Sequence, residues 1–272
     1  MIRQPATNQA REQPEPDEAG AGQHAAPRFF VDFPLAVGQQ VELPEALAHQ
    51  VRRVLRLRPG AALVLLNGDG LEYSVELTAL DGQRAVGQVL ATRRNGTEPR
   101  AAVTLYAAPL KGDHFAYTLQ KATEIGAAAF VPVLTARTIA GEANASKVER
   151  WQRIVREAAE QARRGRVPPV RSPMVLAEAF RLATAAGPGL ILWEEEARQG
   201  LREAIAALPA ARGVAPALGV FIGPEGGFSP AEIALAHEAG IIPVTLGARI
   251  LRAETAAAVA TALALAALGE MD

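Results

Sequence analysis

The chain has 272 residues, of which 49% are apolar, enough for one large domain or two ordinary ones with a hydrophobic core. Its formal charge of -1 gives no overall attraction to nucleic acid, although almost all of its 28 basic residues are arginine, the cation that best suits phosphate and stacked bases. The absence of cysteine excludes disulfides and thiolate chemistry, and four histidines without ligand spacing argue against a metal site.

The first 25 residues are rich in Pro, Gln, Glu and Gly and carry no large apolar residue after Ile2. A segment of this composition cannot bury enough surface to offset the entropy lost on ordering. We therefore expect residues 1–25 to be a disordered tail.

Residues 26–97 contain short strand-like runs that are separated by turn signals. The turns at Asn67 to Gly70 and at Asp81-Gly82 supply residues that accept positive φ, which is typical of β-hairpins. A helix is expected between Pro44 and Pro59. The pattern predicts a small β-barrel with one helix.

After a linker near residues 93–100, apolar strands alternate with helices through the rest of the chain, residues 98–272. The expected strands are at 102–108, 129–134, 189–193, 218–223 and 241–247, and the expected helices are at 116–126, 146–164, 198–208, after Pro230 and at 255–268. Strands without polar alternation are buried on both faces, so we predict an α/β fold with a mostly parallel sheet covered by helices.

Ligands of such a sheet collect at the carboxyl ends of its strands, which directs attention to the loop "GPEGGFSPAE" from Gly223 to Glu232. It lacks the lysine of a phosphate-binding loop and the spacing of a dinucleotide loop. Ser229 and Glu232 form a capping box, which satisfies the helix start internally. What remains is a glycine platform for a flat ligand with Glu225 beside it, or a tight turn without a ligand.

A second loop, "LGARILRAETAAA", runs from Leu246 to Ala258 after the last predicted strand. Its basic residues flank two apolar ones, and Glu254 stands at the start of a helix, where a carboxylate is favoured. Taken alone, the loop is either part of a ligand site or a simple ion pair at a helix start.

The two loops together resemble the SPOUT superfamily of methyltransferases, and within it the ribosomal RNA small subunit methyltransferase E family. Three further segments carry the resemblance, namely "LKGDHFAYTLQKATEIG", "WQRIVREAAEQARRGRVPPV" and "HQVRRVLRLRPG". It covers residues 28 to 270. The chain departs from the family pattern at Ala162-Arg163, where Gly commonly follows a small residue, and at Ala253, which is often Thr.

The resemblance implies a trefoil knot in the methyltransferase domain at 98–272, a PUA-like RNA-binding barrel at 26–97, and a homodimer. It also implies that S-adenosylmethionine is used to methylate N3 of a uridine near the 3′ end of 16S rRNA, in the small ribosomal subunit. The residues that it places at the cofactor are Leu192, Ile222, Gly223, Pro224, Glu225, Gly226, Gly227, Leu246, Gly247, Ile250, Leu251, Arg252 and Thr255.

Methylation of a uridine nitrogen requires stabilisation of negative charge on the uracil oxygens and removal of the N3 proton. We assign the first role to Arg252, and the second to Glu225 or Glu254 without choosing between them. The residues expected at the RNA are Arg28, His49, Arg52, Arg53, Arg56, Arg58, Lys111, Lys121, Arg163, Arg164 and Arg166. The last three are expected near the catalytic face.

The main alternative function is a non-catalytic RNA-binding factor of ribosome assembly that has kept the fold. A metabolic enzyme that binds a nucleotide would need a phosphate or metal motif, which is not found. No apolar run reaches the roughly 18 to 20 residues that span a bilayer, and no secretory signal is recognisable at the start. We expect a soluble cytoplasmic protein without metal or membrane partners.

Overall fold

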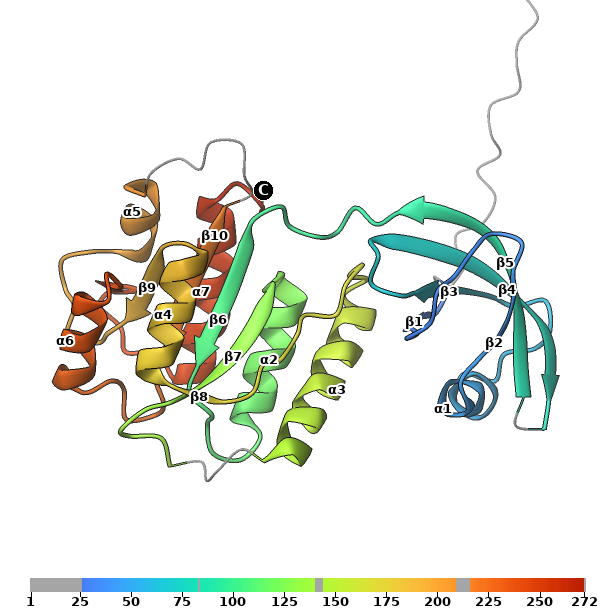
Figure 1. Ribbon diagram of the computed structural model, residues 1–272, viewed down its shortest axis with the longest axis horizontal. Helices are drawn as coiled ribbons and strands as arrows, with labels where there is room; N and C mark the ends of the chain where they lie inside the picture. Colours follow the sequence, from blue (N-terminus) through green and yellow to red (C-terminus); the bar gives the residue numbers. More distant parts are fainter. Residues whose placement is uncertain (1–25, 83, 140–143, 209–215, 272) are drawn as a thin grey trace, which may run out of the picture.

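The computed structural model describes residues 26–82, 84–139, 144–208 and 216–271. These residues form two bodies, each built on its own β-sheet, which lie side by side along the long axis of the molecule (Figure 1). We call them the barrel region, residues 28–94, and the parallel-sheet region, residues 102–267. The tail predicted at 1–25 lies outside the described residues.

The barrel region is a five-stranded sheet with the strand order β1-β3-β4-β5-β2. Both predicted hairpins are confirmed, because β3 pairs with β4 and β4 with β5 in antiparallel register. Its core is a cluster of buried apolar side chains that includes Leu65 on β3 and Val75 on β4. The strands are β1 (Arg28–Phe30), β2 (Gln40–Glu42), β3 (Ala62–Leu66), β4 (Leu71–Asp81) and β5 (Arg84–Arg94).

The helix of the barrel region is shorter than predicted. It consists of α1 (Glu45–His49), which continues as a π-helical turn η1 (Gln50–Val54). The chain then turns back at Arg56, which has a φ of 54°. Because a residue before proline avoids helical geometry, Arg58 also lies outside the helix. The prediction that Arg56 and Arg58 lie on one basic helix with Arg52 is therefore wrong.

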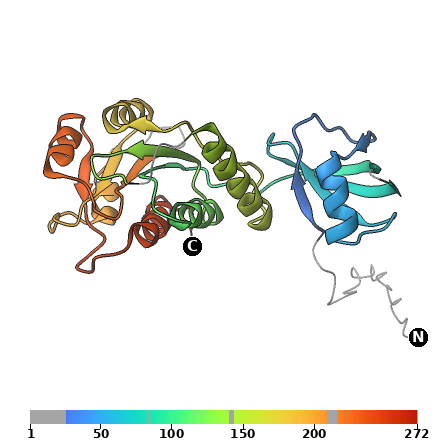
Figure 2. The same cartoon turned by 90° about the horizontal axis from the view of Figure 1, so that it is seen from below.

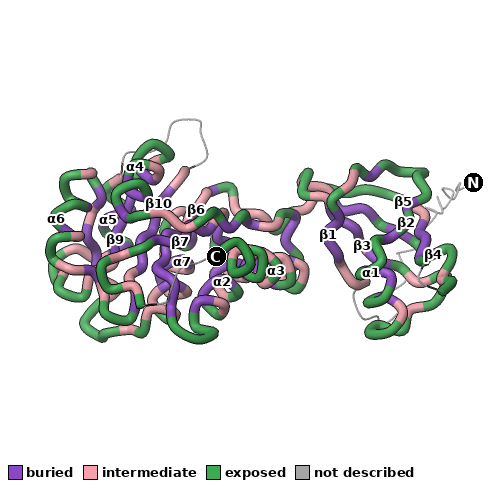
Figure 3. Tube along the Cα trace, turned by 60° about the horizontal axis from the view of Figure 1, so that its bottom comes forward, coloured by how far each residue is buried: buried purple, intermediate pink, exposed green. Residues whose placement is uncertain are grey.

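The parallel-sheet region has six strands in the order β11-β9-β10-β6-β7-β8, and all neighbours pair in parallel. The predicted parallel sheet is confirmed, and its strands run through the buried centre of this body (Figure 3). The strands are β6 (Ala102–Ala107), β7 (Ala129–Leu134), β8 (Met174–Val175), β9 (Gly189–Leu192), β10 (Ala217–Ile222) and β11 (Ile242–Val244).

Helices cover both faces of this sheet, as Figure 2 shows from below. One face packs against α2 (His114–Ile125), α3 (Ala145–Gln161), α5 (Leu201–Ala206) and α7 (Ala253–Ala267). The other packs against α4 (Leu176–Ala186) and α6 (Pro230–Glu238). The sequence prediction omitted β8 and α4, although Leu176, Ala179, Phe180 and Ala183 give α4 a clear apolar stripe.

The last connection of the chain crosses the sheet. It leaves β11 at the edge and ends at α7, which packs against β6 and β10 in the middle. Residues 245–252 therefore pass the carboxyl ends of β9 and β10, beside the loop that follows β10. The trefoil knot implied by the family resemblance stays a prediction.

Candidate functional site

The glycine loop that follows β10 folds tightly back on itself. Gly227 has a φ of 66°, a conformation that suits glycine, and its N–H donates to the carbonyl of Pro224 at 2.9 Å. A Cβ on Gly223 would lie 3.2 Å from the carbonyl carbon of Gly227. The loop therefore presents bare backbone at the carboxyl edge of the sheet.

The start of α6 is capped from within, as predicted. The Glu232 carboxylate accepts the Ser229 N–H at 2.8 Å, and the Ser229 hydroxyl accepts the Glu232 N–H at 3.3 Å. The second Glu232 oxygen accepts the N–H of Ala136 at 2.8 Å, after the end of β7. This internal capping weakens the case for an anion at the helix start.

The tip of the glycine loop is bonded to the segments that follow β6 and β7. The Glu225 carboxylate accepts the Lys111 N–H at 2.9 Å, after β6, and Arg137, after β7, donates to the Gly226 carbonyl at 2.6 Å. Partial burial raises the pKa of Glu225, but the Lys111 N–H and the charges of Lys111 and His114 outweigh it and lower the pKa. Glu225 is therefore held ionised in a fixed position.

Glu194 approaches the same loop from the end of β9. A Cβ on Gly227 would lie 2.6 Å from a Glu194 carboxylate oxygen, so this side chain rests directly against the glycine. Glu194 directly follows a predicted strand, at an edge where ligands of such a sheet collect, but no sequence pattern offered a reason to assign it a role. Arg137 was not predicted, and its position near the end of β7 is the signal that could have found it.

The loop that follows β11 exposes apolar and cationic side chains beside the glycine loop. Ile250 is 87% exposed, and Leu246 and Leu251 are half-buried. Arg249 and Arg252 are exposed and form no ion pair with any residue that the structure describes. An uncovered aliphatic side chain next to unpaired guanidiniums is typical of a surface that binds a ligand or a partner.

The candidate acid and base residues meet around the segment between β6 and α2. Glu254 in the first turn of α7 lies 3.2 Å from Nδ1 of His114, and its side chain is 13% exposed. The charge of His114 also acts on Glu225. His114 thus contacts Glu254 and acts through its charge on Glu225, and Arg252 is the residue that precedes α7. A lone histidine gave no sequence signal for this role.

The remaining predicted cofactor residues surround these loops. Leu192 and Ile222 end β9 and β10, Pro224 is buried in the glycine loop, and Thr255 is exposed in the first turn of α7. Gly247 has a φ of 108°. Across the described ranges there is no group of three metal-ligating side chains. The donor set of backbone amides, carbonyls and aliphatic walls fits a flat organic ligand such as adenine.

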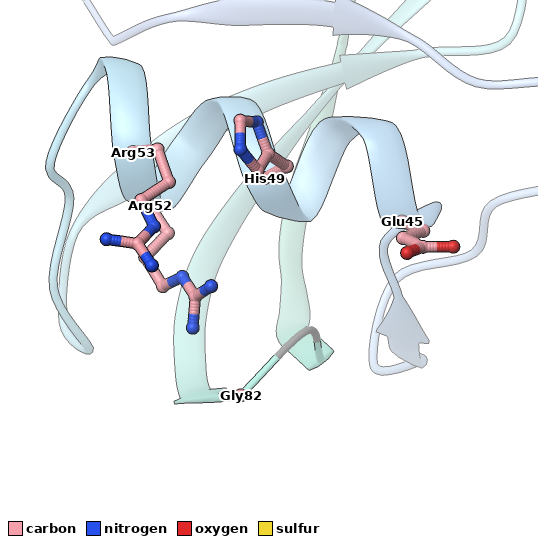
Figure 4. A pocket seen from close by; sticks show the side chains of 5 residues that line it. All are labelled: Glu45, His49, Arg52, Arg53 and Gly82. Atoms are coloured by element: carbon pink, nitrogen blue, oxygen red, sulfur yellow. The ribbon is translucent and has the colours of Figure 1, made fainter.

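On the barrel region, α1 and η1 form a basic hollow of about 230 Å³ (Figure 4). His49, Arg52 and Arg53 line it together with Glu45 and the turn at Gly82. Arg52 and Arg53 project toward that turn, whereas Glu45 lies at the far end of the helix (Figure 4). The hollow brings three of the predicted RNA-contacting residues together.

Two of the arginines predicted to contact RNA are structural. Arg28 is largely buried and pairs with Glu72. Arg164 is 4% exposed, and its guanidinium donates to the carbonyls of Thr123 and Ala127 and to the Glu98 carboxylate. The predictions for Arg28 and Arg164 are wrong, because both guanidiniums are largely buried and are paired with carboxylates inside the protein.

The segment from Arg163 to Arg166 was expected at the catalytic face, but it does not lie there. Arg164 contacts the end of α2 and the start of β7, which is the amino edge of the parallel sheet. The cofactor loops lie at the opposite, carboxyl edge. Arg163, Arg166 and Lys111 are exposed, as are Arg56 and Arg58, while Lys121 pairs with Glu124 on α2 at 2.8 Å.

Comparison with known proteins bears on both regions. Residues 97–265 match the RNA methyltransferase domain family, and residues 45–90 match the RNA methyltransferase PUA domain family. "Ribosomal RNA small subunit methyltransferase E" of Synechocystis is 38% identical over 82% of this chain and 71% of its own length. The protein of that name from Mycobacterium bovis is 37% identical over 85% of this chain and 88% of its own length.

Solved structures of methyltransferases are also similar to this chain over most of its length. Ribosomal RNA small subunit methyltransferase E of Neisseria gonorrhoeae, bound to S-adenosylmethionine, is 35% identical, with a TM-score of 0.79 over 89% of this chain and 98% of that one. A Legionella pneumophila methyltransferase in complex with the same cofactor is 30% identical, with a TM-score of 0.81 over the same shares. Within the described ranges, no helix has the length and apolar character that crossing a bilayer requires.

Proposed function

The chain belongs to the ribosomal RNA small subunit methyltransferase E family, and from this premise we propose that it transfers a methyl group from S-adenosylmethionine to N3 of a uridine in 16S rRNA. The observation that carries the proposal is that two loops leave the carboxyl edge of the same parallel sheet, one after β10 and one after β11. The first supplies the bare backbone of Gly226 and Gly227 with Glu225, and the second leads through the exposed Ile250 and Arg252 to Glu254.

The residues of the two loops suit the cofactor. Backbone groups of the glycine loop can bond to the edge of adenine, while Leu246, Ile250 and Leu251 supply apolar contacts to its faces. S-adenosylmethionine, when bound, supplies a methyl group on a positively charged sulfur. Relatives from Neisseria gonorrhoeae and Legionella pneumophila are described as bound to this cofactor, which supports the assignment.

Arg252 is the residue that we assign to the uracil. It is exposed, it has no acidic partner among the described residues, and it precedes the first turn of α7. A fixed guanidinium near O2 or O4 stabilises the negative charge that develops as N3 loses its proton. Because no carboxylate among the described residues neutralises it, its charge is available to the substrate.

We assign the removal of the N3 proton to Glu254 rather than to Glu225. Glu225 is bonded to the Lys111 N–H and its pKa is lowered, which makes it a weaker base than an ordinary glutamate. Glu254 lies against His114, so a proton that reaches this pair can pass on to solvent through the half-exposed imidazole. Glu225 then serves to fix the glycine loop.

A homodimer and an RNA-binding barrel complete the proposal. Ile250 stands uncovered at the cofactor loops, and a second copy of the chain placed there would exclude water from the site. The basic hollow of His49, Arg52 and Arg53 suits an RNA phosphate. The substrate is proposed to be rRNA in the small ribosomal subunit, as the names of the relatives suggest.

The decisive experiment is mass spectrometry of 16S rRNA from cells with and without the protein. We expect one uridine to gain a methyl group that blocks its Watson–Crick edge, so that reverse transcription stops there. The purified protein should bind S-adenosylmethionine in calorimetry and restore the modification on subunits from the deletion strain. If folded protein binds the cofactor but intact subunits gain no methyl group at uridine N3, the proposed reaction is wrong.

A further inference from the structure

The charged side chains at the junction between the two regions differ in their exposure to solvent. Two carboxylates of the junction are withdrawn, since the side chains of Glu72 and Glu98 are 6% and 23% exposed, whereas the exposed Asp32 is paired with Arg156 at 2.6 Å. Three guanidiniums of the junction face outward, since the Arg93 side chain is 72% exposed and Arg163 and Arg166 are also exposed. The junction therefore presents several guanidiniums to solvent, while the carboxylates of Glu72 and Glu98 serve as internal anchors.

One network holds this arrangement together across the two regions. Glu72 on β4 accepts bonds from Arg93 at 2.7 Å and from the Asn95 side chain at 2.8 Å. The same Asn95 amide donates to the carbonyl of Arg163 at 3.1 Å, and the Thr97 hydroxyl donates to that carbonyl at 2.9 Å. The backbone of Arg163 is thereby fixed to the barrel region.

Arg163 has a backbone conformation that is unfavourable for an arginine. Its φ is 58°, in the left-handed region that glycine adopts without penalty. The bonds from Asn95 and Thr97 to its carbonyl hold this conformation in place. An arginine in a conformation that favours glycine points to a role for its side chain, and this side chain is an exposed guanidinium.

Arg166 extends the same surface onto the barrel. Its N–H donates to Glu98 at 3.3 Å, and its guanidinium lies 3.9 Å from the position of a Cβ on Gly70, in the turn between β3 and β4. Asp69 in that turn uses its two carboxylate oxygens for the Leu71 N–H and the Tyr73 hydroxyl. Its charge is therefore held in the turn by these two bonds.

We propose that Arg93, Arg163 and Arg166 form a junction surface that binds the phosphodiester backbone of rRNA where it crosses between the two regions. Exposed guanidiniums on both sides of a hydrogen-bonded junction suit successive phosphates of one RNA strand. The inference rests on the proposed function for the identity of its partner. The junction surface lies at the amino edge of the sheet, away from the cofactor loops. It therefore contributes to substrate affinity, and the methyl-transfer step does not depend on it.

The test uses Arg163→Gly, Arg166→Ala and the double variant, with Arg181→Ala as the matched control. Arg181 is an exposed arginine on α4, outside both sites. Binding of a 16S rRNA transcript is measured over a series of salt concentrations, and KM and kcat are measured on unmethylated small subunits. Thermal unfolding is followed for each variant.

We expect each substitution to weaken RNA binding about 3- to 10-fold and to reduce the slope of log affinity against log salt by roughly 1. KM should rise while kcat and cofactor affinity stay unchanged. Arg163→Gly should unfold at the same or a higher temperature than the parent, because glycine accepts the positive φ. A loss of binding in a protein that is no less stable separates an RNA contact from a structural role.

The proposal is overturned if the double variant binds the transcript with the affinity and salt slope of Arg181→Ala. Failure of the junction surface and failure of the proposed function give different results. If the parent protein methylates subunits but the double variant binds as the control does, the junction surface alone is wrong. If the parent protein forms no methylated uridine, the proposed function is wrong, and the transcript measurements still decide whether the surface binds RNA.

Discussion

The cofactor loops and the junction are built from the same residue types, glutamate and arginine, but they use them in opposite ways. At the junction, Glu72 and Glu98 are withdrawn and saturated by guanidiniums and amides. At the loops, Glu225 is bonded to a backbone N–H while Arg252 is left exposed and unpaired among the described residues. The buried, saturated carboxylates fix the architecture of the junction, whereas the unpaired guanidinium of Arg252 is available to a ligand.

The largest effect is expected for Gly227→Val. A β-branched residue at a φ of 66° must rearrange the glycine loop, and its Cβ would displace Glu194. We expect cofactor binding in calorimetry to fall by more than about 100-fold, equivalent to about 3 kcal/mol. Gly240→Val is the control, since Gly240 has a φ of 77° with open space around it. Both variants should lose similar stability, and equal cofactor affinity in the two would contradict the loop assignment.

The second largest effect is expected for Arg252→Ala, which should lower kcat alone. We expect kcat to fall about 100- to 1000-fold, as is typical when one group that stabilises developing negative charge is removed. Cofactor affinity should stay within about threefold of the parent value, which direct titration checks. The melting temperature should be unchanged, because the Arg252 side chain makes no capping bond to α7. Arg202→Ala, at an exposed position on α5, serves as the control. An unaltered kcat would remove Arg252 from the mechanism.

Glu72→Gln addresses the junction and should change stability without changing cofactor affinity. Burial raises the pKa of Glu72, but bonds from Arg28, Arg93 and Asn95 outweigh it and lower the pKa from 4.5 to about 2. A depressed pKa stabilises the fold above pH 4.5, and this stability is lost as the pH falls toward 2. The corresponding difference in the free energy of unfolding is about 3 kcal/mol.

Urea unfolding at pH 7 and pH 3 measures this difference. The gap between the parent protein and Glu72→Gln should shrink at the lower pH. Glu42→Gln is the matched control, because Glu42 forms an exposed pair with Arg84 at 3.0 Å. Such surface pairs contribute about 0 to 1 kcal/mol. If both variants lose the same stability, the junction network is not an anchor.

Ser229→Ala should give the smallest effect. It removes the cap of α6, which costs about 1 kcal/mol of unfolding free energy. Asn144→Ala removes the equivalent cap of α3, where the side chain accepts the Lys147 N–H at 3.0 Å, away from the glycine loop. Chemical denaturation should report similar losses for the two variants. Only Ser229→Ala should also weaken cofactor binding, by a few-fold, since α6 continues directly from the loop.

Sequence patterns predicted those parts of the fold that depend on neighbouring residues. The hairpin turns at Asn67 to Gly70 and at Asp81-Gly82, the buried parallel strands and the capping box of Ser229 and Glu232 are all confirmed. The helix expected up to Pro59 was too long, because its last turn is π-helical and the chain reverses at Arg56. Local propensity does not register such a reversal.

The candidate site shows the same limit. The glycine loop and the segment at Leu246 to Thr255 were recognised from their residues and spacing. The contacts of His114 with Glu254, of Arg137 with the Gly226 carbonyl and of Glu194 with Gly227 were not. Each joins segments that are distant in the chain, and their proximity follows from the order of the strands in the sheet.

The sequence by itself determined the class of fold, the family and the two loops at the carboxyl edge of the sheet. Only the tertiary structure decided which arginines are available. Arg163 and Arg164 are adjacent in the chain, yet one is exposed and the other is buried against Glu98 and two carbonyls. Turns, caps and periodicity are set by local backbone chemistry, whereas the burial of a charge depends on partners that only the folded chain brings together.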